Sequence, residues 1–261
     1  MLENLINRIE SRDASMTRVV AFVLIFLGQT VICGSAMAEV SVEPTRIVLN
    51  KSQHTQTIIV RNDGSRSVSV GLVWTKMVQA ADASLHPTGV ARDVRQARLI
   101  TVTPTKAELY PGQQAIFTLQ LDPNTPDGIE IREHLRFDID QTIKKGPRWA
   151  VVIPVFVRLG IAAPKVSISG AHYGQDGKVY VSMIHTNGAS PYGHLSVFDQ
   201  QSEIARLNNI NLYQQGQNTT FSLPVPGGTN RNLRVQYVGD AEFLGQLFAE
   251  QVWQISSGPS Q

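Results

Sequence analysis

The feature that most constrains this chain is the alternation of apolar and polar residues in short runs, with almost no helical periodicity. Two phrases show it: 40–49 is followed by 57–62, and 102–112 is followed by 114–119. Each time, an extended, β-branched stretch reaches a polar turn, and a second alternating run comes after it. Side chains that alternate with a period of two belong to half-buried strands, so the sequence predicts an all-β fold.

Short strands divided by turn formers fill both halves of the chain, which is typical of immunoglobulin-like β-sandwiches. The polar, irregular stretch 80–98 is expected to be a long loop or crossover. In the first half we expect strands near 40–49, 55–62, 67–78, 98–103, 114–121, 131–140 and 149–159. In the second half we expect them near 165–169, 178–184, 193–199, 218–223, 231–238 and 248–255.

The pattern breaks once, directly after a strongly apolar strand, at a stretch of small residues that ends in a proline. We therefore expect two immunoglobulin-like domains in tandem, 39–160 and 165–261, joined by a short linker at 161–164. No low-complexity segment and no exact repeat separates them.

Residues 1–38 have the pattern of a secretion signal. The apolar run 19–28 follows Arg18, and an Ala-Met-Ala cleavage site ends at Ala38. The run is shorter than the roughly 20 residues of a membrane span, although a retained N-terminal anchor is the alternative. We expect cleavage after Ala38 and export to the periplasm, with Met16 as an alternative start.

Composition argues against several classes of function. The single cysteine, Cys33, lies in the signal segment, so the secreted chain would hold no disulfide and no cysteine-based zinc site. The six histidines show no ligand spacing, and we expect neither a metal nor a cofactor. A net charge of +2 without a basic stripe argues against nucleic acid. No catalytic motif appears, so we expect neither an enzyme nor a small-molecule substrate.

The most apolar stretch of the secreted chain, 149–158, contains Pro154, which favours an edge strand because proline cannot donate to a ladder. One interpretation is a last core strand covered by the second domain. The other is an edge that pairs with another chain, or with a second copy of this one. In that case alternate side chains would enter the partner's groove: Trp149, Val151, Ile153 and Val155.

Arg46 interrupts the first expected strand at a position that can face inward. One interpretation is an ordinary exposed arginine, because charged side chains are seldom buried unpaired. The other is a guanidinium that captures the terminal carboxylate of a partner in a bidentate, charge-assisted pair.

Several phrases in order resemble the periplasmic pilus-assembly chaperones of the chaperone/usher pathway. Thr45–Leu49 is similar to the family's first-strand phrase, and Ile58–Asn62 to its second-strand phrase ending in Asn. Val102–Gln113 is similar to its segment with two prolines and a glycine, and Arg132–Phe137 stands at an Arg-Glu-Ser-Leu-like stretch. The resemblance covers roughly the whole secreted chain, and in the second half it is one of pattern only.

This resemblance implies two immunoglobulin-like domains in an L shape with a cleft between them. Such chaperones lend the last strand of their first domain to a fibre subunit that lacks one strand. They then deliver the subunit to an outer-membrane usher. Arg46 would hold the subunit's C-terminal carboxylate. The family's cleft lysine is missing from 153–158, so Arg158 or Lys165 is expected to replace it, unless Arg46 acts alone; this departure is typical of a divergent, non-classical branch.

Two other functions stay open. A structural subunit or adhesin of the fibre would favour a single sandwich with a donor extension, whereas here the first strand begins at the expected cleavage site. A hydrolase or metal protein would need a catalytic or ligand cluster. The edge strand and the resemblance together favour a chaperone.

Overall fold

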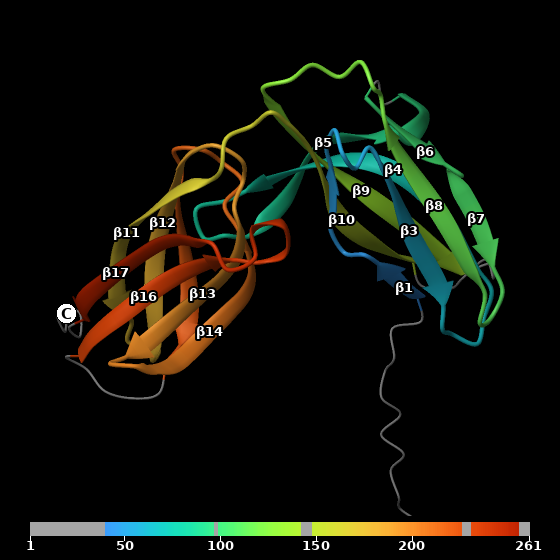
Figure 1. Ribbon diagram of the computed structural model, residues 1–261. Helices are drawn as coiled ribbons and strands as arrows, with labels where there is room; N and C mark the ends of the chain where they lie inside the picture. Colours follow the sequence, from blue (N-terminus) through green and yellow to red (C-terminus); the bar gives the residue numbers. More distant parts are fainter. Residues whose placement is uncertain (1–39, 97–98, 142–147, 226–230, 256–261) are drawn as a thin grey trace, which may run out of the picture. The chain divides into compact units, whose positions relative to one another are not determined.

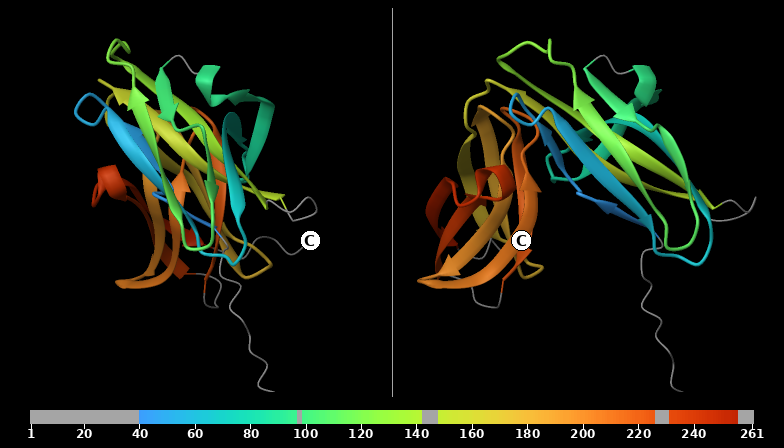
Figure 2. Two further views of the ribbon diagram at one scale, coloured as in Figure 1. Left: turned by 90° about the vertical axis from the view of Figure 1, so that its right-hand side faces the viewer. Right: turned by 45° about the vertical axis from the view of Figure 1, so that its right-hand side comes forward.

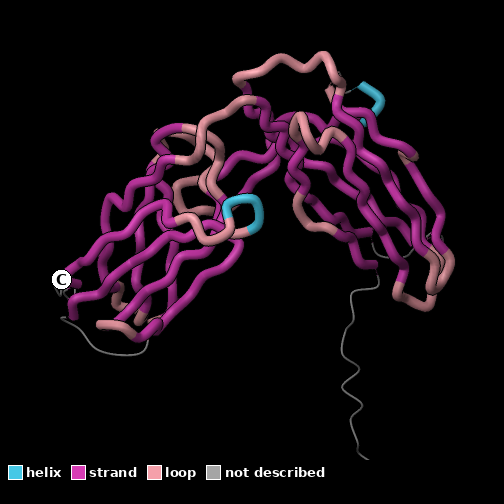
Figure 3. The backbone as a smooth tube through the Cα atoms, viewed as in Figure 1, coloured by secondary structure: helices cyan, strands magenta, loops and turns pink. Residues whose placement is uncertain are grey.

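The computed structural model describes residues 40–96, 99–141, 148–225 and 231–255. Glu39–Gln261 group into one compact unit, separate from Met1–Ala38, and the expected signal segment lies outside the described residues. Strands dominate the described chain, whose helical turns are the short η1 (Val94–Gln96) and η2 (Ala241–Phe243) (Figure 3). No helix in these residues has the length and apolarity to cross a membrane.

The first sandwich can be followed from blue to yellow-green in Figure 1. Its strands are β1 (Val40–Glu43), β2 (Ile47–Leu49), β3 (Thr55–Asn62), β4 (Val68–Gln79), β5 (Leu85–Asp93), β6 (Ile100–Thr103), β7 (Lys106–Leu109), β8 (Gln114–Leu121), β9 (Ile129–Gln141) and β10 (Arg148–Leu159). One sheet has the order β1-β3-β8-β6. The other has the order β2-β10-β9-β4-β5, with β7 also paired to β4.

The second sandwich follows after residues 160–164 and is drawn in yellow to red in Figure 2. Its strands are β11 (Lys165–Tyr173), β12 (Lys178–Asn187), β13 (Tyr192–Asp199), β14 (Ser202–Asn211), β15 (Asn218–Pro224), β16 (Arg231–Gly239) and β17 (Leu247–Ile255). The sheets have the orders β11-β12-β15 and β14-β13-β16-β17. With its own buried core, this sandwich confirms the expected fold of two immunoglobulin-like β-sandwiches.

The first expected strand is in fact two strands, because the chain changes sheets at Pro44. β1 pairs antiparallel with β3, whereas β2 pairs parallel with β10 in the opposite sheet. Pro104 marks the same change between β6, which pairs with β8, and β7, which pairs with β4. Both prolines follow a cis peptide bond, and a proline interrupts a ladder because it has no N–H. The two matched sequence phrases are thus two sheet-changing strands.

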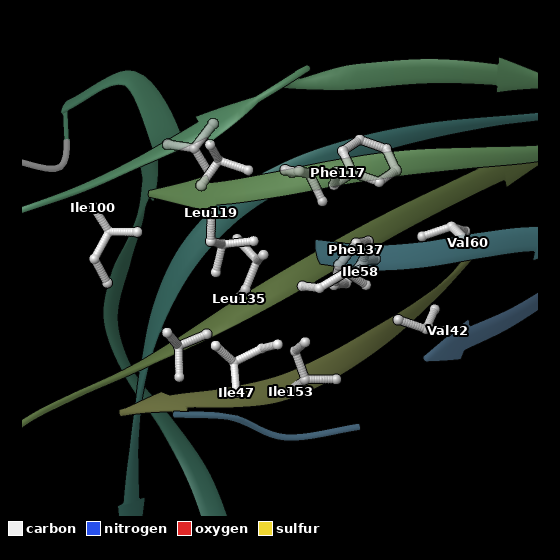
Figure 4. Close-up of a cluster of buried hydrophobic side chains, with 14 of the residues drawn as sticks. Val42, Ile47, Ile58, Val60, Ile100, Phe117, Leu119, Leu135, Phe137 and Ile153 are labelled. Atoms are coloured by element: carbon white, nitrogen blue, oxygen red, sulfur yellow. The ribbon is translucent and has the colours of Figure 1, made fainter. Parts of the chain in front are cut away.

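Burial in the first sandwich follows the period of two along each strand. On β8, Phe117 and Leu119 are fully buried, while Ile116, on the opposite face of the strand, is exposed. Figure 4 shows side chains from both sheets meeting in this core, among them Ile58, Phe117, Leu135 and Phe137. The rings of Phe117 and Phe137 meet edge to face with centroids 5.9 Å apart, which is a geometry that aromatic pairs prefer.

The expected strand plan lacks β7 and is wrong in two further places. Residues 80–98, expected to be a long loop or crossover, contain β5, which pairs with β4 and leaves most of its side chains exposed. Residues 202–211 were not among the expected strands, yet they form β14, paired with β13. Both are edge strands with little buried surface, so they lack the alternation on which the sequence interpretation depends.

Phe117→Ala should lower the free energy of unfolding of the first sandwich by about 3–5 kcal/mol, because it leaves a cavity among fully buried side chains. Ile116→Ala on the same strand removes a side chain from a residue that is 52% exposed, and should change stability by less than about 0.5 kcal/mol. Urea unfolding followed by tryptophan fluorescence measures both. Equal losses from the two variants would contradict the assignment of faces on β8.

Candidate functional site

One edge of the first sandwich is only partly paired. β9 pairs with all of β10, Arg148–Leu159, but on the other side β2 reaches only Val155–Val157. No described strand pairs with residues 148–154 on that side. The cause is the change of sheets at Pro44: the residues before it form β1 in the opposite sheet, so they do not extend β2 along β10. We call residues 148–154 the free edge.

The four expected donor side chains lie on one face of β10, as the period of two requires. This face points into the sandwich's own core, where Ile153 and Val155 are fully buried. Trp149 and Val151 pack against the same core but are only half-buried. The structure therefore differs from the expectation that all four are available to a partner. The difference arises because β2 closes the sandwich beside Val155 but not beside Trp149.

Arg46 packs on the opposite face of β10. Arg46 directly precedes β2, whose Ile47 is in register with Val155. The side chain of Arg46 therefore lies beside β10 on the face that carries Phe156, and it contacts the ring of Phe156. The guanidinium carbon lies 3.9 Å from the ring centroid of Phe156 and 4.4 Å from that of Tyr192. Aromatic faces this close stabilise a cation. With its side chain only 11% exposed, Arg46 is not an ordinary surface arginine.

Arg158 uses all three nitrogens of its guanidinium. Nε donates to Glu130 at 2.9 Å, Nη2 donates to the backbone carbonyl of Ser190 at 2.6 Å, and Nη1 donates to Glu242. Ser190 in turn donates its N–H and its hydroxyl to Glu130. The Arg158 side chain is only 7% exposed, and a charge so buried requires such partners. Arg158 therefore links β10 with the turn before β13 and with η2.

Arg46 shares the carboxylate of Glu242 with Arg158. Nη2 of Arg46 donates to Oε1 of Glu242 at 2.9 Å, and the same oxygen accepts from Arg158. Nη1 of Arg46 donates to the side-chain oxygen of Asn211 at 2.9 Å, while its Nε is buried without a partner. The two arginines that the sequence suggested as carboxylate anchors thus lie together and bind one carboxylate of this chain.

Arg132 on β9 is the third member of what we call the arginine cluster: Arg46, Arg132 and Arg158. Its guanidinium carbon lies 4.3 Å from the ring centroid of Tyr213, and Nη1 donates to the carbonyl of Tyr213 at 2.7 Å. It forms no ion pair with any described residue, and its Nε is buried without a partner. Burial lowers its pKa. Among the described residues, Glu130 and Glu242 are the two carboxylates that bind Arg46 and Arg158, and none binds Arg132, so the cluster keeps an excess positive charge.

His134 lies beside Arg132 in an apolar setting. Its residue is 3% exposed and neither ring nitrogen has a partner. The ring meets Tyr213 edge to face with centroids 5.9 Å apart. Burial, and to a lesser degree the charge of Arg132, lower the pKa of His134 to about 4. No group of three or more His, Cys, Asp or Glu in the described parts of the chain is arranged to hold a metal.

The hairpin of β4 and β5 fixes Tyr213 from the other side. The side chain of Gln79 donates to the carbonyl of Asn211 at 2.9 Å and accepts from the N–H of Tyr213 at 2.9 Å. The carbonyl of Ala81 accepts from the N–H of Thr220 at 2.7 Å. A buried glutamine that satisfies two backbone groups at once holds them in one arrangement. Tyr213 is thereby held against both Arg132 and Phe156.

Sequence reasoning found two members of the cluster and missed its other parts. The apolar residues Ile131, Leu135 and Phe137 stand at odd positions of this strand, so the position of Arg132 facing away from the core was visible in the pattern, although its role was not. Glu242 lies between two strands of the second half, and nothing in the sequence places it beside Arg46. Lys165, the other expected substitute for the missing lysine, is exposed at the start of β11.

His134→Phe should reduce the loss of stability in acid. An unfolded histidine takes up a proton near pH 6.5, whereas folded His134 does so near pH 4. The unfolded state therefore binds more protons between these values, and stability falls as the pH falls, by at most about 3 kcal/mol from this residue. Urea unfolding at pH 7 and pH 4.5 measures it, with the exposed His54→Phe as the control. A variant that loses as much stability as the wild type would show that His134 does not titrate in this way.

Comparisons with known proteins find likeness in structure but not in sequence. No protein-family model matches the chain, and no curated protein matches it. The solved structure of the YadV chaperone aligns with a TM-score of 0.51 and 12% identity, over 83% of this chain and 99% of that one. The CupB2 chaperone of Pseudomonas aeruginosa aligns with a TM-score of 0.50 and 13% identity, over 84% of this chain and 100% of that one.

A further similar structure is a complex of CsuC and CsuE, a chaperone with a tip adhesion subunit, from the archaic chaperone-usher Csu pili of Acinetobacter baumannii. Its TM-score is 0.49 at 15% identity, over 85% of this chain and 100% of that one. The resemblance expected from the sequence phrases is confirmed as a likeness of fold by the YadV and CupB2 chaperones. The chain thus has the two-sandwich immunoglobulin-like fold of these chaperones.

Proposed function

We propose that this protein is a periplasmic chaperone that binds incomplete immunoglobulin-like subunits of a surface fibre by strand pairing, without catalysis. The observation that carries the proposal is the free edge of β10, which ends at Arg46. A strand with unpaired N–H and C=O groups is a template for another strand, and adding a strand to such an edge is a recurrent mode of peptide recognition. The likeness of fold to two proteins named chaperones supports it.

The register predicts the direction of the bound strand. β2 pairs parallel with β10, and Ile47 is in register with Val155. A client strand that continues the line of β2 along the free edge would therefore run parallel to β10 and finish next to Arg46. Its C-terminal carboxylate would then meet the arginine cluster, whereas an antiparallel strand would bring its positive N-terminus there. The charge of the cluster favours the parallel arrangement.

Arg46 is the residue best suited to bind that carboxylate, and Arg132 is the best second candidate. Arg46 stands at the end of the free edge, and Arg132, without an ion pair among the described residues, supplies the excess charge. Arg158, the substitute for the missing lysine that the sequence suggested, has no nitrogen to spare. We therefore assign Arg158 to holding Glu130, Ser190 and Glu242 in place.

The donor residues proposed here are fewer than the sequence suggested. Trp149 and Val151 are half-buried beside the free edge and are open to a client core. Ile153 and Val155 belong to the chaperone's own core, so they would support the donated strand from behind. In this proposal the chaperone then delivers the client to an outer-membrane usher. In the absence of a client, a second copy of this chain can cover the free edge.

To test the proposal, the full tagged chain is expressed together with the secreted proteins encoded beside its gene. The proteins that co-purify with it are identified by mass spectrometry. We expect one small β-rich secreted protein at a 1:1 ratio. Arg46→Ala should reduce capture at least about tenfold, because a charge-assisted pair to the terminal carboxylate is lost. The matched control is Arg61→Ala, an arginine of the same sandwich that is 58% exposed and paired with Asp63. Unchanged capture by Arg46→Ala would remove Arg46 from the site, and the absence of any partner would overturn the chaperone function.

A further inference from the structure

Glu242 already occupies the position that a client carboxylate would take. It lies on η2, in the connection between β16 and β17. Its Oε1 accepts a hydrogen bond from Nη2 of Arg46 at 2.9 Å and another from Nη1 of Arg158. One carboxylate oxygen held between two guanidiniums is the arrangement expected for a bound carboxylate anion.

The charge of Glu242 is favourable where it lies. Burial alone would raise the pKa of its carboxyl, but the hydrogen bond and charge of Arg46, together with the charge of Arg158, lower the pKa below the usual value. Glu242 is therefore ionised at neutral pH. Arg46 rests between the rings of Phe156 and Tyr192, where an unpaired guanidinium would be costly.

The surroundings of Glu242 allow it to leave. η2 is a single short turn whose other members, Ala241 and Phe243, are not fully buried. Glu242, Phe243 and Arg158 are among the residues that line a pocket of about 240 Å³, so open space adjoins this turn. When Glu242 leaves, Arg158 keeps Glu130 and the carbonyl of Ser190. Arg46 keeps Asn211 and loses the one carboxylate that it binds among the described residues.

We propose that Glu242 is an internal substitute for the client's terminal carboxylate, and that a client must displace it from Arg46 to bind. This inference rests on the proposed function of Arg46. In this way Glu242 raises the selectivity of the site for strands that end in a free carboxylate. A single side-chain carboxylate or an amide gains too little to replace an anion that is already in place. A terminal carboxylate gains more, because it arrives with a strand that pairs along the free edge at the same time.

The experiment uses the full chain and two short strand peptides of alternating threonine and valine, identical except that one ends in a carboxylate and the other in an amide. Calorimetry measures the affinity of each. Glu242→Gln keeps the size of the side chain but removes its charge. It should bind the acid peptide roughly tenfold more tightly than the wild type does, because no anion has to be displaced. Its affinity for the amide peptide should not change.

Two further variants separate this role from a merely structural one. Glu250→Gln on β17 removes another glutamate of the same sandwich and should leave both affinities unchanged. Glu250 accepts a hydrogen bond from Gln236 and forms an ion pair with Arg234. Glu242→Asp keeps the charge on a shorter side chain that cannot bridge both arginines, and should give a smaller gain. If Glu242 had a structural role alone, Glu242→Gln would bind both peptides more weakly than the wild type and would have a lower melting temperature.

The outcomes distinguish this inference from the function on which it rests. If the wild type prefers the acid peptide but Glu242→Gln shows no gain, the carboxylate site stands and the displacement of Glu242 is overturned. If the wild type binds acid and amide peptides equally, or binds neither, the carboxylate site itself is wrong, and the inference fails with it.

Discussion

The change of sheets at Pro44 is the constraint on which the rest of the structure depends. Because the residues before Pro44 form β1 in the opposite sheet, and the chain joins the sheet of β10 only after Pro44, β2 is only three residues long. This one event leaves residues 148–154 of β10 without a second neighbour. It also places Arg46 at the point where the missing neighbour would end. An exposed, apolar strand edge is ordinarily a risk of aggregation, and proteins keep one only where it is blunted or used. Here the edge ends at a cluster of arginines, which in the proposed function would give a bound strand both a direction and an end point.

The arginine cluster shows how three cations can be gathered in a largely buried place. Aromatic rings cover their faces: Phe156 and Tyr192 enclose Arg46, and Tyr213 covers Arg132. Carboxylates take only part of the charge, because Glu130 and Glu242 both bind Arg158, and Glu242 also binds Arg46. Buried ion pairs seldom add much stability over apolar packing, since the cost of removing charges from water offsets their attraction. An arrangement that keeps a cation in excess is therefore better explained by binding an anion than by stability.

The sequence was sufficient for the fold and for part of the site, and the reasons are physical. Strands such as β3 and β8 bury every second residue, so their alternation identified them. β5 and β14 lie at sheet edges with little buried surface, and the same reasoning missed them. Pro154 lies on the part of β10 that has β9 as its one described neighbour, although β10 as a whole lies between β2 and β9. However, a sequence does not show which face of a strand meets its own core, and Ile153 and Val155 were consequently expected to be free. Arg46 was visible as a charge inside a strand, whereas Glu242 reaches it from 196 positions further along the chain. A local sequence pattern does not indicate a contact between residues so far apart in the sequence.

In the proposed function, a client strand pairs with residues 148–154. Hydrogen exchange of the full chain, alone and in complex with the captured client, tests it most directly, because backbone amides exchange slowly only when they are hydrogen-bonded or buried. We expect the amides of 148–153 that point away from β9 to exchange quickly in the free protein and to become protected in the complex. Those of β14, an edge strand of the second sandwich, should be unchanged. Protection confined to other strands, with 148–154 still exchanging quickly in the complex, would contradict it.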